Sequence, residues 1–290
     1  MKKIFITGSN GFLGKNLFNN LSINNEVFGY KRNQNIIEKL NFFKPNIIIN
    51  CAAEIYKEEL MFDSNVILTN EILKYCLLNK DTELIQIGSS SEYGKKNNPT
   101  KECDNFNVSN IYESTKGAAT LLCQGYARNY NLPIIIVRPY SVFGRYEKKY
   151  RFIPSIIKNI LLNENITIYN GNHDFIYIKD FIRGINILLN SNKKIIGDIV
   201  NFCSGIQYSN KEVYETACKI FNKKNTNAIF KNEFLRKQDN LCWIGDSSYA
   251  KFQYNFKTEY SLEQGIKDIK KEIYGQGTEK IRETLDRYFL

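Results

Sequence analysis

The sequence predicts an α/β protein built on a doubly wound parallel sheet. Short β-branched runs alternate with longer helix-forming stretches through the first half of the 290 residues. Two of these runs, Ile47–Ile49 and Ile134–Val137, contain no polar residue, as expected of parallel strands that are covered on both faces. A glycine-rich turn joins the first run to the first helical stretch. Together these observations indicate strands linked by right-handed helical crossovers.

The first half is expected to hold five strands with helices between them. The strands are predicted at Lys3–Thr7, Glu26–Tyr30, Asn46–Asn50, Glu83–Gly88 and Ile134–Arg138. The helices are predicted at Lys15–Leu21, Ile36–Phe43, Asn65–Leu78 and Tyr112–Tyr130.

The pattern changes after Gly144. Helices are predicted at Ile153–Leu162, Lys211–Phe221, Ser248–Phe252 and Leu262–Tyr274, with a short strand at Ile166–Tyr169. The runs Asp174–Ile178 and Ile199–Cys203 are expected to return to the main sheet. We therefore expect a sheet domain of residues 1–145 and 172–205, a smaller lobe of 146–171 and 206–273, and a helical tail of 274–290.

Bulk properties narrow the classes of function. No run of 18 apolar residues is present, and the start is too short for a signal-peptide apolar region, so a cytoplasmic location without membrane insertion is expected. The net charge is +10, but no basic stretch is interleaved with aromatic residues, so nucleic acid is not an expected partner. A metal site is not expected either, because His173 is the only histidine and no Cys-x-x-Cys pattern occurs.

The pattern Gly8-x-x-Gly11-x-x-Gly14 follows the first strand and opens a helix. The first glycine permits a tight turn, the second lets the backbone approach a pyrophosphate, and the third allows close packing of helix and strand. The helix N-terminus then faces the phosphates. This arrangement predicts a Rossmann-type dinucleotide site.

The end of the second strand bears on the choice between NAD and NADP. An acidic residue there would bind the adenine ribose hydroxyls, but this strand continues into Lys31 and Arg32. Two cations suit a 2′-phosphate, so NADP, as NADPH, is the expected cofactor and NAD the less favoured one. A solvated basic turn is the alternative interpretation.

Tyr112 and Lys116 stand four residues apart and share one face of a helix. A lysine ammonium near a tyrosine hydroxyl makes that hydroxyl a better acid–base group at neutral pH. Upstream, the serines of Gly88-Ser-Ser-Ser-Glu-Tyr-Gly94 end a strand, where a hydroxyl can hold a carbonyl oxygen beside Tyr112. A hydride transfer between a nicotinamide ring and a carbonyl or alcohol is the indicated chemistry.

Eight ordered motifs give the chain a resemblance to the extended short-chain dehydrogenase/reductases of the nucleotide-sugar epimerase, dehydratase and 4-ketoreductase type. The resemblance runs from Lys3 to about Ile273. It rests on Gly8-x-x-Gly-x-x-Gly14, Asn50-Cys-Ala-Ala53, Ser64-Asn-Val66, Ser89-Ser-Ser-Glu-Tyr-Gly94, Tyr112-x-x-x-Lys116, Arg138-Pro-Tyr-Ser-Val-Phe-Gly144, Asp174-Phe-Ile-Tyr-Ile-x-Asp180 and Asp246-Ser-Ser-Tyr-Ala-Lys251.

The resemblance implies roles for individual residues. The catalytic residues would be Ser89, Tyr112 and Lys116, with Ser90 as the alternative hydroxyl. The cofactor would be bound by Gly8, Asn10, Gly11, Phe12, Leu13, Gly14, Lys31, Arg32, Ala52, Ala53, Tyr112, Lys116, Pro139 and Val142. A nucleotide sugar would be bound by Ser89, Ser90, Ser91, Tyr112, Ser141, His173 and Arg236, with Arg236 of the smaller lobe holding the pyrophosphate.

Departures from the family pattern narrow the expected reaction. Dehydratases of the family place Asp and Glu directly after the catalytic hydroxyl, where this chain has Ser90 and Ser91. Members that epimerise at carbons 3 and 5 use a histidine after the Arg138–Gly144 region; here His173 instead falls where a phosphate-binding arginine is common. The short segment before Asn46 resembles the compact 4-ketosugar reductases.

We therefore expect NADPH-dependent reduction of the C4 keto group of a CDP-, dTDP- or GDP-linked 4-keto-deoxysugar, a step of deoxysugar and surface-polysaccharide biosynthesis. An NAD-dependent nucleotide-sugar 4-epimerase is the alternative. A non-catalytic NADP-binding sensor is a third option, which the intact serine, tyrosine and lysine argue against. The expected partners are the nucleotide sugar and, as an option, a second copy of the chain in a homodimer.

Overall fold

The computed structural model describes residues 1–32, 34–191, 196–223, 227–235, 242–275 and 280–290. Its contacts divide the chain into two units. The first comprises Met1–Gly94, Lys101–Pro139 and Ile185–Phe202, and the second comprises Lys95–Thr100, Tyr140–Gly184 and Cys203–Leu290.

The first unit is built on a six-stranded parallel sheet, which confirms the predicted fold class. The strands are β1 (Lys3–Thr7), β2 (Glu26–Gly29), β3 (Ile47–Asn50), β4 (Glu83–Ile87), β5 (Ile134–Pro139) and β9 (Ile196–Phe202). Their order is β2-β1-β3-β4-β5-β9. The chain runs outward from β1 to β2 and then crosses to β3 on the other side of β1, so a topological switch point lies between β1 and β3.

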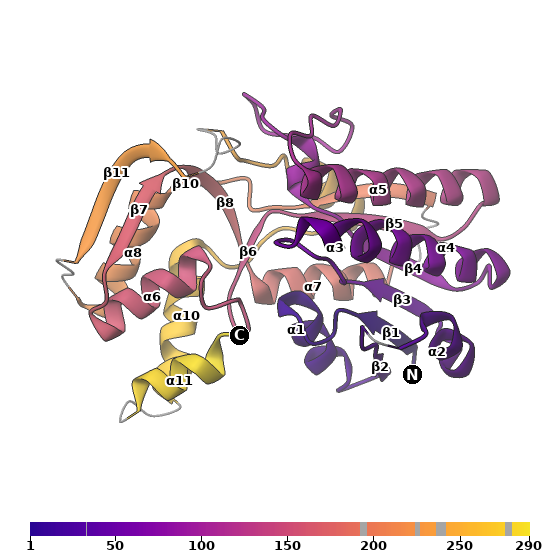
Figure 1. Ribbon diagram of the computed structural model, residues 1–290, viewed down its shortest axis with the longest axis horizontal. Helices are drawn as coiled ribbons and strands as arrows, with labels where there is room; N and C mark the ends of the chain where they lie inside the picture. The colour runs from indigo at the N-terminus through magenta and orange to yellow at the C-terminus, as the bar shows by residue number, and fades with distance from the viewer. Residues whose placement is uncertain (33, 192–195, 224–226, 236–241, 276–279) are drawn as a thin grey trace. The chain divides into compact units, whose positions relative to one another are not determined.

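Helices cover both faces of this sheet. In Figure 1, α4 (Leu68–Leu78) and α5 (Ile111–Tyr130) lie on one side, and α1 (Phe12–Leu21) and the second half of α7 (Ile178–Leu189) lie on the other. Shorter elements are α2 (Ile36–Phe43), α3 (Glu58–Phe62), the π-helical turn η1 (Asp63–Ile67) and the 3-10 turn η2 (Ser90–Tyr93). Buried side chains from β1, α2, α4 and α5 form one apolar cluster, including Phe5, Leu40, Ile72 and Cys123.

Local sequence signals place two of these helices where they were predicted. Helix α2 begins after Asn35, whose side chain accepts the N–H of Glu38 at 3.1 Å, and it ends at Lys44 in the left-handed conformation. Helix α5 begins after Asn110, which accepts the N–H of Glu113 at 2.9 Å. This cap fixes the start of the helix at Ile111, one residue before Tyr112.

In the described part of the second unit there are two small sheets and five further helices. One sheet has the order β10-β8-β6, formed by β10 (Gln207–Ser209), β8 (Asn172–Tyr177) and β6 (Ser141–Phe143), and the other pairs β7 (Ile166–Asn170) with β11 (Ala228–Phe234). The helices are α6 (Phe152–Leu162), α8 (Asn210–Phe221), α9 (Ser248–Tyr254), α10 (Leu262–Gly275) and α11 (Ile281–Tyr288).

The expected return of Asp174–Ile178 to the main sheet is wrong. That segment forms β8, which pairs with β6 and β10 in the second unit, whereas the last predicted strand joins the main sheet as β9. The buried carboxylate of Asp174 accepts the N–H groups of Ser204, Gly205 and Gly245 and so ties β8 to that unit. Residues 140–145 and 172–184 consequently group with the second unit rather than the first.

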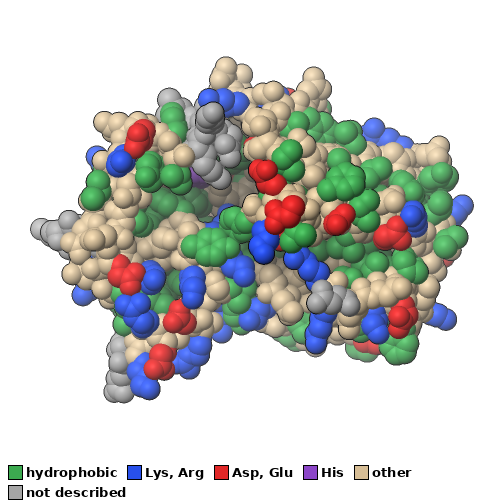
Figure 2. Space-filling view, in the orientation of Figure 1, with side chains coloured by type: hydrophobic (Ala, Val, Ile, Leu, Met, Phe, Trp, Pro, Cys, Tyr) green, Lys and Arg blue, Asp and Glu red, His purple; other side chains and the backbone are tan. Residues whose placement is uncertain are grey.

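Charged side chains are mixed by sign on the face shown in Figure 2, where lysines and arginines lie among acidic residues. The net charge of +10 is therefore not gathered into one stripe on that face. Within the described part of the chain, no helix combines the length and apolar character needed to cross a membrane.

Candidate active site

The three glycines of the first turn are required by the space around them. Gly8 has φ +65°, and the N–H of Gly11 donates to the carbonyl of Gly8 at 2.9 Å. A Cβ on Gly14 would lie 2.2 Å from the Gly8 carbonyl oxygen, and a Cβ on Gly8 would lie 2.9 Å from the backbone N of Ala52. The turn is thus packed tightly beside the loop after β3, at the switch point where α/β sheets bind ligands.

The start of α1 next to this turn offers backbone N–H groups to an anion. Gly11 is its N-cap, and the first turn of the helix carries no acidic side chain. Asn10 is exposed, while Phe12 and Leu13 are half-buried. These features fit a pyrophosphate, so Gly8–Gly14 can hold a dinucleotide.

A buried polar chain fixes the loop after β3. The hydroxyl of Thr7 contacts the side-chain oxygen of Asn50 and accepts the N–H of Ala52 at 3.1 Å. The Asn50 amide donates to Gln86 at 2.8 Å, which links β3 to β4. The predicted cofactor residues Ala52 and Ala53 lie in this loop, beside the glycine turn.

Lys31 and Arg32 are both exposed, and Arg32 has protein partners. Its guanidinium donates to Glu54 at 3.3 Å and to the hydroxyl of Ser64 at 3.2 Å. Burial opposes ionisation of Glu54, but the N–H groups of Tyr56 and Lys57, together with Arg32, hold its pKa below the usual value. Sequence reasoning missed Glu54, although it directly follows Ala52-Ala53 in the motif after β3.

Helix α5 carries Tyr112 and Lys116, and the Lys116 side chain is buried. Tyr112 is half-buried, whereas Lys116 is only 3% exposed and donates from Nζ to the carbonyl of Ile87 at 2.5 Å. Burial lowers the pKa of Lys116, opposed by Glu92 and by the thiols of Cys51 and Cys123. The ammonium therefore sits at the carboxyl end of β4, one residue before the serine turn begins.

Asn65 connects the π-helical turn to the same helix. Its side-chain amide donates to the Thr115 hydroxyl at 3.0 Å and to the Glu54 carbonyl at 3.0 Å. Thr115 in turn donates to the carbonyl of Tyr112 at 3.0 Å. The motif Ser64–Val66 marked this segment in the sequence. In the structure, Asn65 stabilises the first turn of α5 through its hydrogen bond to Thr115.

The serine turn after β4 is closed by a capping box. Ser89 Oγ accepts the N–H of Ser91 at 3.2 Å, and the Ser89 N–H donates to Glu92 Oε1 at 2.7 Å. Glu92 Oε2 accepts from Nε of Arg138 at 2.8 Å, with both side chains buried. Ser90 is buried as well. The buried pairing of Glu92 with Arg138 was not anticipated, because a glutamate in a serine-rich turn is usually solvated.

The remaining predicted residues divide between the two units. Pro139 ends β5 in the first unit and is buried. In the second unit, Val142 is buried in β6, and Ser141 Oγ lies 3.4 Å from Nδ1 of His173 on the neighbouring strand β8. Ser141 and His173, two of the residues predicted to bind the nucleotide sugar, thus lie next to each other. Arg236 lies outside the described residues.

Among the described residues, no group of three or more His, Cys, Asp or Glu side chains is arranged to hold a metal ion. The first unit instead combines the glycine turn with a serine from the turn after β4 and a tyrosine and a lysine from α5. Such a set can move a proton to or from an oxygen while hydride moves at the adjacent carbon.

Comparisons with known proteins identify the family of the chain. The family model described as "NAD dependent epimerase/dehydratase family" matches residues 4–203. The dTDP-D-glucose 4,6-dehydratase of Dictyostelium discoideum is 27% identical over 274 residues. That match covers 77% of this chain and 62% of the relative, so the chain spans about three fifths of the relative's length.

Two solved structures share the fold over nearly all of the chain. The UDP-glucuronic acid 4-epimerase of Bacillus cereus, in complex with UDP-glucuronic acid and NAD, gives a TM-score of 0.84 at 24% identity and covers 94% of this chain and 100% of its own. The dTDP-glucose 4,6-dehydratase of Bacillus anthracis, in complex with NAD, gives a TM-score of 0.84 at 19% identity, with coverage of 97% and 100%. The family match covers residues 4–203, more than half of the chain, and leads to one conclusion: the chain belongs to the NAD dependent epimerase/dehydratase family.

Proposed function

We propose that the chain reduces the C4 keto group of a nucleotide-linked 4-keto-deoxysugar with NADPH, the nucleotide being CDP, dTDP or GDP. The observation that carries this proposal is the serine turn. Ser90 and Ser91 stand where the dehydratase pattern has its acidic pair, and the one carboxylate of the turn, Glu92, is buried and paired with Arg138. The turn offers hydroxyls for binding a carbonyl and no carboxylate for removing a hydroxyl as water.

The chemistry would be divided among three side chains of the first unit. Tyr112 would protonate the oxygen at C4 as negative charge develops there, and Ser89 would donate a hydrogen bond to the same oxygen. Lys116 would keep a positive charge close to both and bind the nicotinamide ribose. When bound, the nicotinamide supplies the hydride that reaches C4.

The dinucleotide would be held by the cradle and the loop beside it. Gly8 and Gly14 let the turn pack closely, because a Cβ at either would lie within 3.0 Å of backbone atoms, and the N-terminus of α1 would then face the pyrophosphate. Ala52 and Ala53 would line the adjoining wall. Pro139 and Val142 are proposed to line the nicotinamide.

The choice of NADPH rests on Lys31 and Arg32, which take the place of an acidic ribose ligand. Arg32 is paired with Glu54 and so is held near the end of β2, where a 2′-phosphate would sit. A phosphate group would compete with that carboxylate for one exposed guanidinium. Lys31 adds a second exposed cation at the same place.

The nucleotide sugar would also contact the second unit. Ser141 and His173 form a polar pair on β6 and β8. Each can donate or accept a hydrogen bond, as binding to a sugar hydroxyl or phosphate oxygen requires. Arg236 is proposed, on the family resemblance alone, to bind the pyrophosphate.

A 4-epimerase is the second candidate, and a specific observation favours it. The Bacillus cereus structure is of a UDP-glucuronic acid 4-epimerase with NAD, and its fold matches over 94% of the chain. An epimerase would use the same Ser89, Tyr112 and Lys116 but would retain its NAD through the cycle. The cations after β2 argue for NADPH, and therefore for the reductase. A non-catalytic sensor would have no need for Ser89, Tyr112 and Lys116 together.

Turnover of a panel of CDP-, dTDP- and GDP-linked 4-keto-deoxysugars with NADPH tests the proposal. One NADPH should be oxidised for each sugar reduced, and the product should carry a hydroxyl at C4 by NMR. Failure with every 4-ketosugar, together with interconversion of saturated C4 epimers, would replace the reductase by the epimerase.

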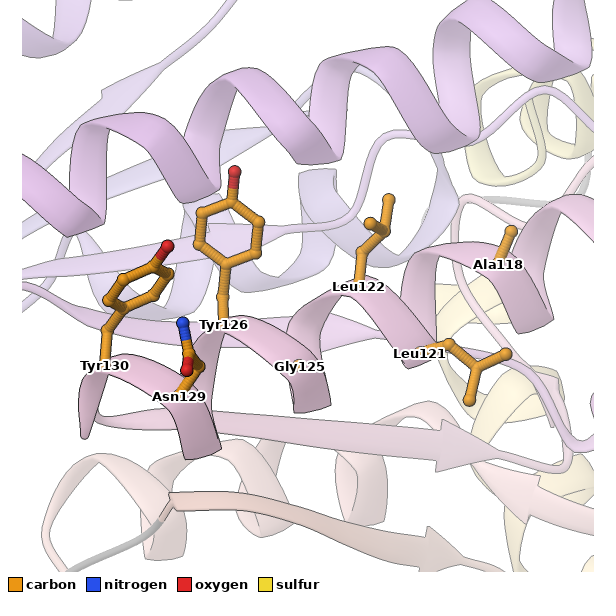
Figure 3. Close-up of a pocket in the computed structure, with 7 residues that line it drawn as sticks. All are labelled: Ala118, Leu121, Leu122, Gly125, Tyr126, Asn129 and Tyr130. Atoms are coloured by element: carbon orange, nitrogen blue, oxygen red, sulfur yellow. The ribbon is translucent and has the colours of Figure 1, made fainter.

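We also propose that two copies of the chain associate through α5. Along this helix a shallow apolar groove is lined by Ala118, Leu121, Leu122, Gly125, Tyr126, Asn129 and Tyr130, as Figure 3 shows. Leu121 is 55% exposed, and the space beyond Gly125 is open, so a second helix can approach closely there. A second copy is the natural occupant because a two-fold axis places the same face against itself.

The oligomeric state of two variants tests this association. Leu121→Glu should convert a dimer to a monomer in analytical ultracentrifugation, because a charge would be buried in an apolar interface. Phe252→Glu is the matched control, since Phe252 is 86% exposed on α9 and is not one of the residues that line the groove. A monomeric unmodified protein at micromolar concentration would refute the proposed dimer.

A further inference from the structure

The Ser89 hydroxyl has two hydrogen-bond contacts with Ser91. A serine hydroxyl has one proton to donate and two lone pairs with which to accept. Ser91 brings two donors to it: the Ser91 N–H lies 3.2 Å from Ser89 Oγ, and the Ser91 hydroxyl oxygen lies 2.6 Å from it. If both donate to Ser89, both lone pairs are used and the proton of Ser89 must point elsewhere.

The backbone around Ser89 is held so that this geometry is maintained. The Ser89 N–H donates to Glu92 Oε1 at 2.7 Å, and Glu92 Oε2 is engaged by Arg138 on β5. The Arg138 guanidinium lies over the ring of Tyr93, 4.4 Å from its centroid. The turn therefore cannot swing away from the sheet without breaking a buried ion pair.

A substrate oxygen decides the direction of the hydrogen bond between the two serines. The two hydroxyls share one hydrogen bond, and either can donate it. A C4 oxygen that gains negative charge attracts the Ser89 proton, which leaves Ser91 as the donor to Ser89. Hydrogen bonds that run in one direction strengthen each other, so donation by Ser91 makes Ser89 a better donor.

We infer that Ser91 is a positioning residue that makes Ser89 a dedicated hydrogen-bond donor to the C4 oxygen of the sugar. The inference rests on the proposed function, because it needs an oxygen on which charge develops. It adds a role that acts through Ser89, and it holds for the reductase and the epimerase alike. Ser91 thus supports a charge that forms only as the reaction proceeds.

Kinetics of Ser91 variants test the inference on any nucleotide sugar that the unmodified protein converts. Ser91→Ala keeps the N–H but removes the hydroxyl donor, and it should lower kcat by roughly 10- to 100-fold with KM changed by less than about threefold. Ser91→Thr restores a hydroxyl and should recover most of kcat. Ser114→Ala is the matched control, because Ser114 is exposed on α5 and bonds only the Asn110 carbonyl among the described contacts.

The outcomes separate this inference from the proposed function. A kcat for Ser91→Ala within about twofold of the unmodified protein overturns the inference while the function stands. If no nucleotide sugar is converted, the proposed function fails, and the inference fails with it because it needs an oxygen on which charge develops.

Discussion

Arg138 Nε donates to Glu92 Oε2 at 2.8 Å, and the two side chains are 1% and 0% exposed. This pair joins β5 to the turn that carries Ser89. The two terminal nitrogens of Arg138 have no hydrogen-bond partner within the described residues, so Glu92 is the principal hydrogen-bond acceptor for this guanidinium.

Removing one member of this pair should therefore be costly. Arg138→Met leaves a buried carboxylate without its counter-charge, and we expect the free energy of unfolding to fall by about 3–5 kcal/mol in urea titrations. The double variant Arg138→Met/Glu92→Gln should lose clearly less than the sum of the single changes. The exposed pair Lys267–Glu263, at 2.7 Å, is the control, and Lys267→Met should cost about 0–1 kcal/mol. Strict additivity in the Arg138–Glu92 cycle would contradict the coupling.

The acid–base role of Tyr112 predicts a large and selective loss of turnover. Tyr112→Phe removes the proton donor and should lower kcat by about 10²- to 10⁴-fold. Dinucleotide binding, measured by fluorescence titration, should survive because the cradle lies at Gly8–Gly14. Tyr126→Phe on the outer part of α5 serves as the matched control. Near-normal turnover by Tyr112→Phe would remove Tyr112 from the mechanism.

Cofactor preference is predicted from the two cations after β2. The unmodified protein should bind NADPH more tightly than NADH by isothermal titration calorimetry. The double variant Lys31→Gln/Arg32→Gln should weaken the binding of NADPH by about 1.5 kcal/mol or less per lost contact, because both side chains are exposed. The affinity for NADH should stay unchanged. Glu54→Gln should tighten the binding of NADPH, since the Glu54 carboxylate would no longer compete with the 2′-phosphate for Arg32. Equal affinity of the unmodified protein for the two cofactors would refute the assignment.

The buried side chain of Glu147 predicts that the folding stability of the protein depends on pH. Burial raises the pKa of Glu147 to about 7, opposed by Arg151 at 3.3 Å. Because the folded-state pKa is raised, the stability that this group contributes is present below pH 4.5 and is lost as the pH rises through about 7. The loss should amount to roughly 2–4 kcal/mol between these limits.

Urea unfolding across this pH range measures the effect. Glu147→Gln keeps the shape of the neutral side chain, so its stability should fall less steeply between pH 4.5 and 7 than that of the unmodified protein. Glu83→Gln, at an exposed glutamate, should leave the slope unchanged. Parallel profiles for the unmodified protein and Glu147→Gln would show that Glu147 is not the titrating group.

Much of the first unit could be predicted from the sequence because its signals are local. Continuous isoleucine runs indicate β3 and β5, and Asn35 and Lys44 mark the ends of α2 at the predicted bounds. The glycine spacing indicates the cradle, since Gly11 and Gly14 are constrained by backbone atoms of the same turn, whereas Gly8 is constrained by the loop after β3. The helix expected at Asn65–Leu78 instead begins as a π-helical turn, Asp63–Ile67, and becomes α-helical only at Leu68.

Pairings between distant segments could not be predicted in this way. The alternation in Asp174–Ile178 predicts a strand but carries no information on its partner, so β8 was expected in the wrong sheet. Glu92 and Arg138 are 46 residues apart, and nothing in either local pattern shows that they meet. The bond from Asn65 to Thr115 spans 50 residues and was hidden for the same reason.

The fate of one hydrogen tests the central claim most directly. The protein is incubated with a nucleotide-linked 4-keto-deoxysugar and NADPH that carries deuterium at both positions of nicotinamide C4, and the sugar is then examined by NMR. A reductase places one deuterium at sugar C4 for each NADPH oxidised, and this is the predicted result. Two observations together would contradict it. No deuterium would enter the ketosugar, and in a separate incubation without added cofactor the protein would interconvert the C4 epimers of a saturated nucleotide sugar.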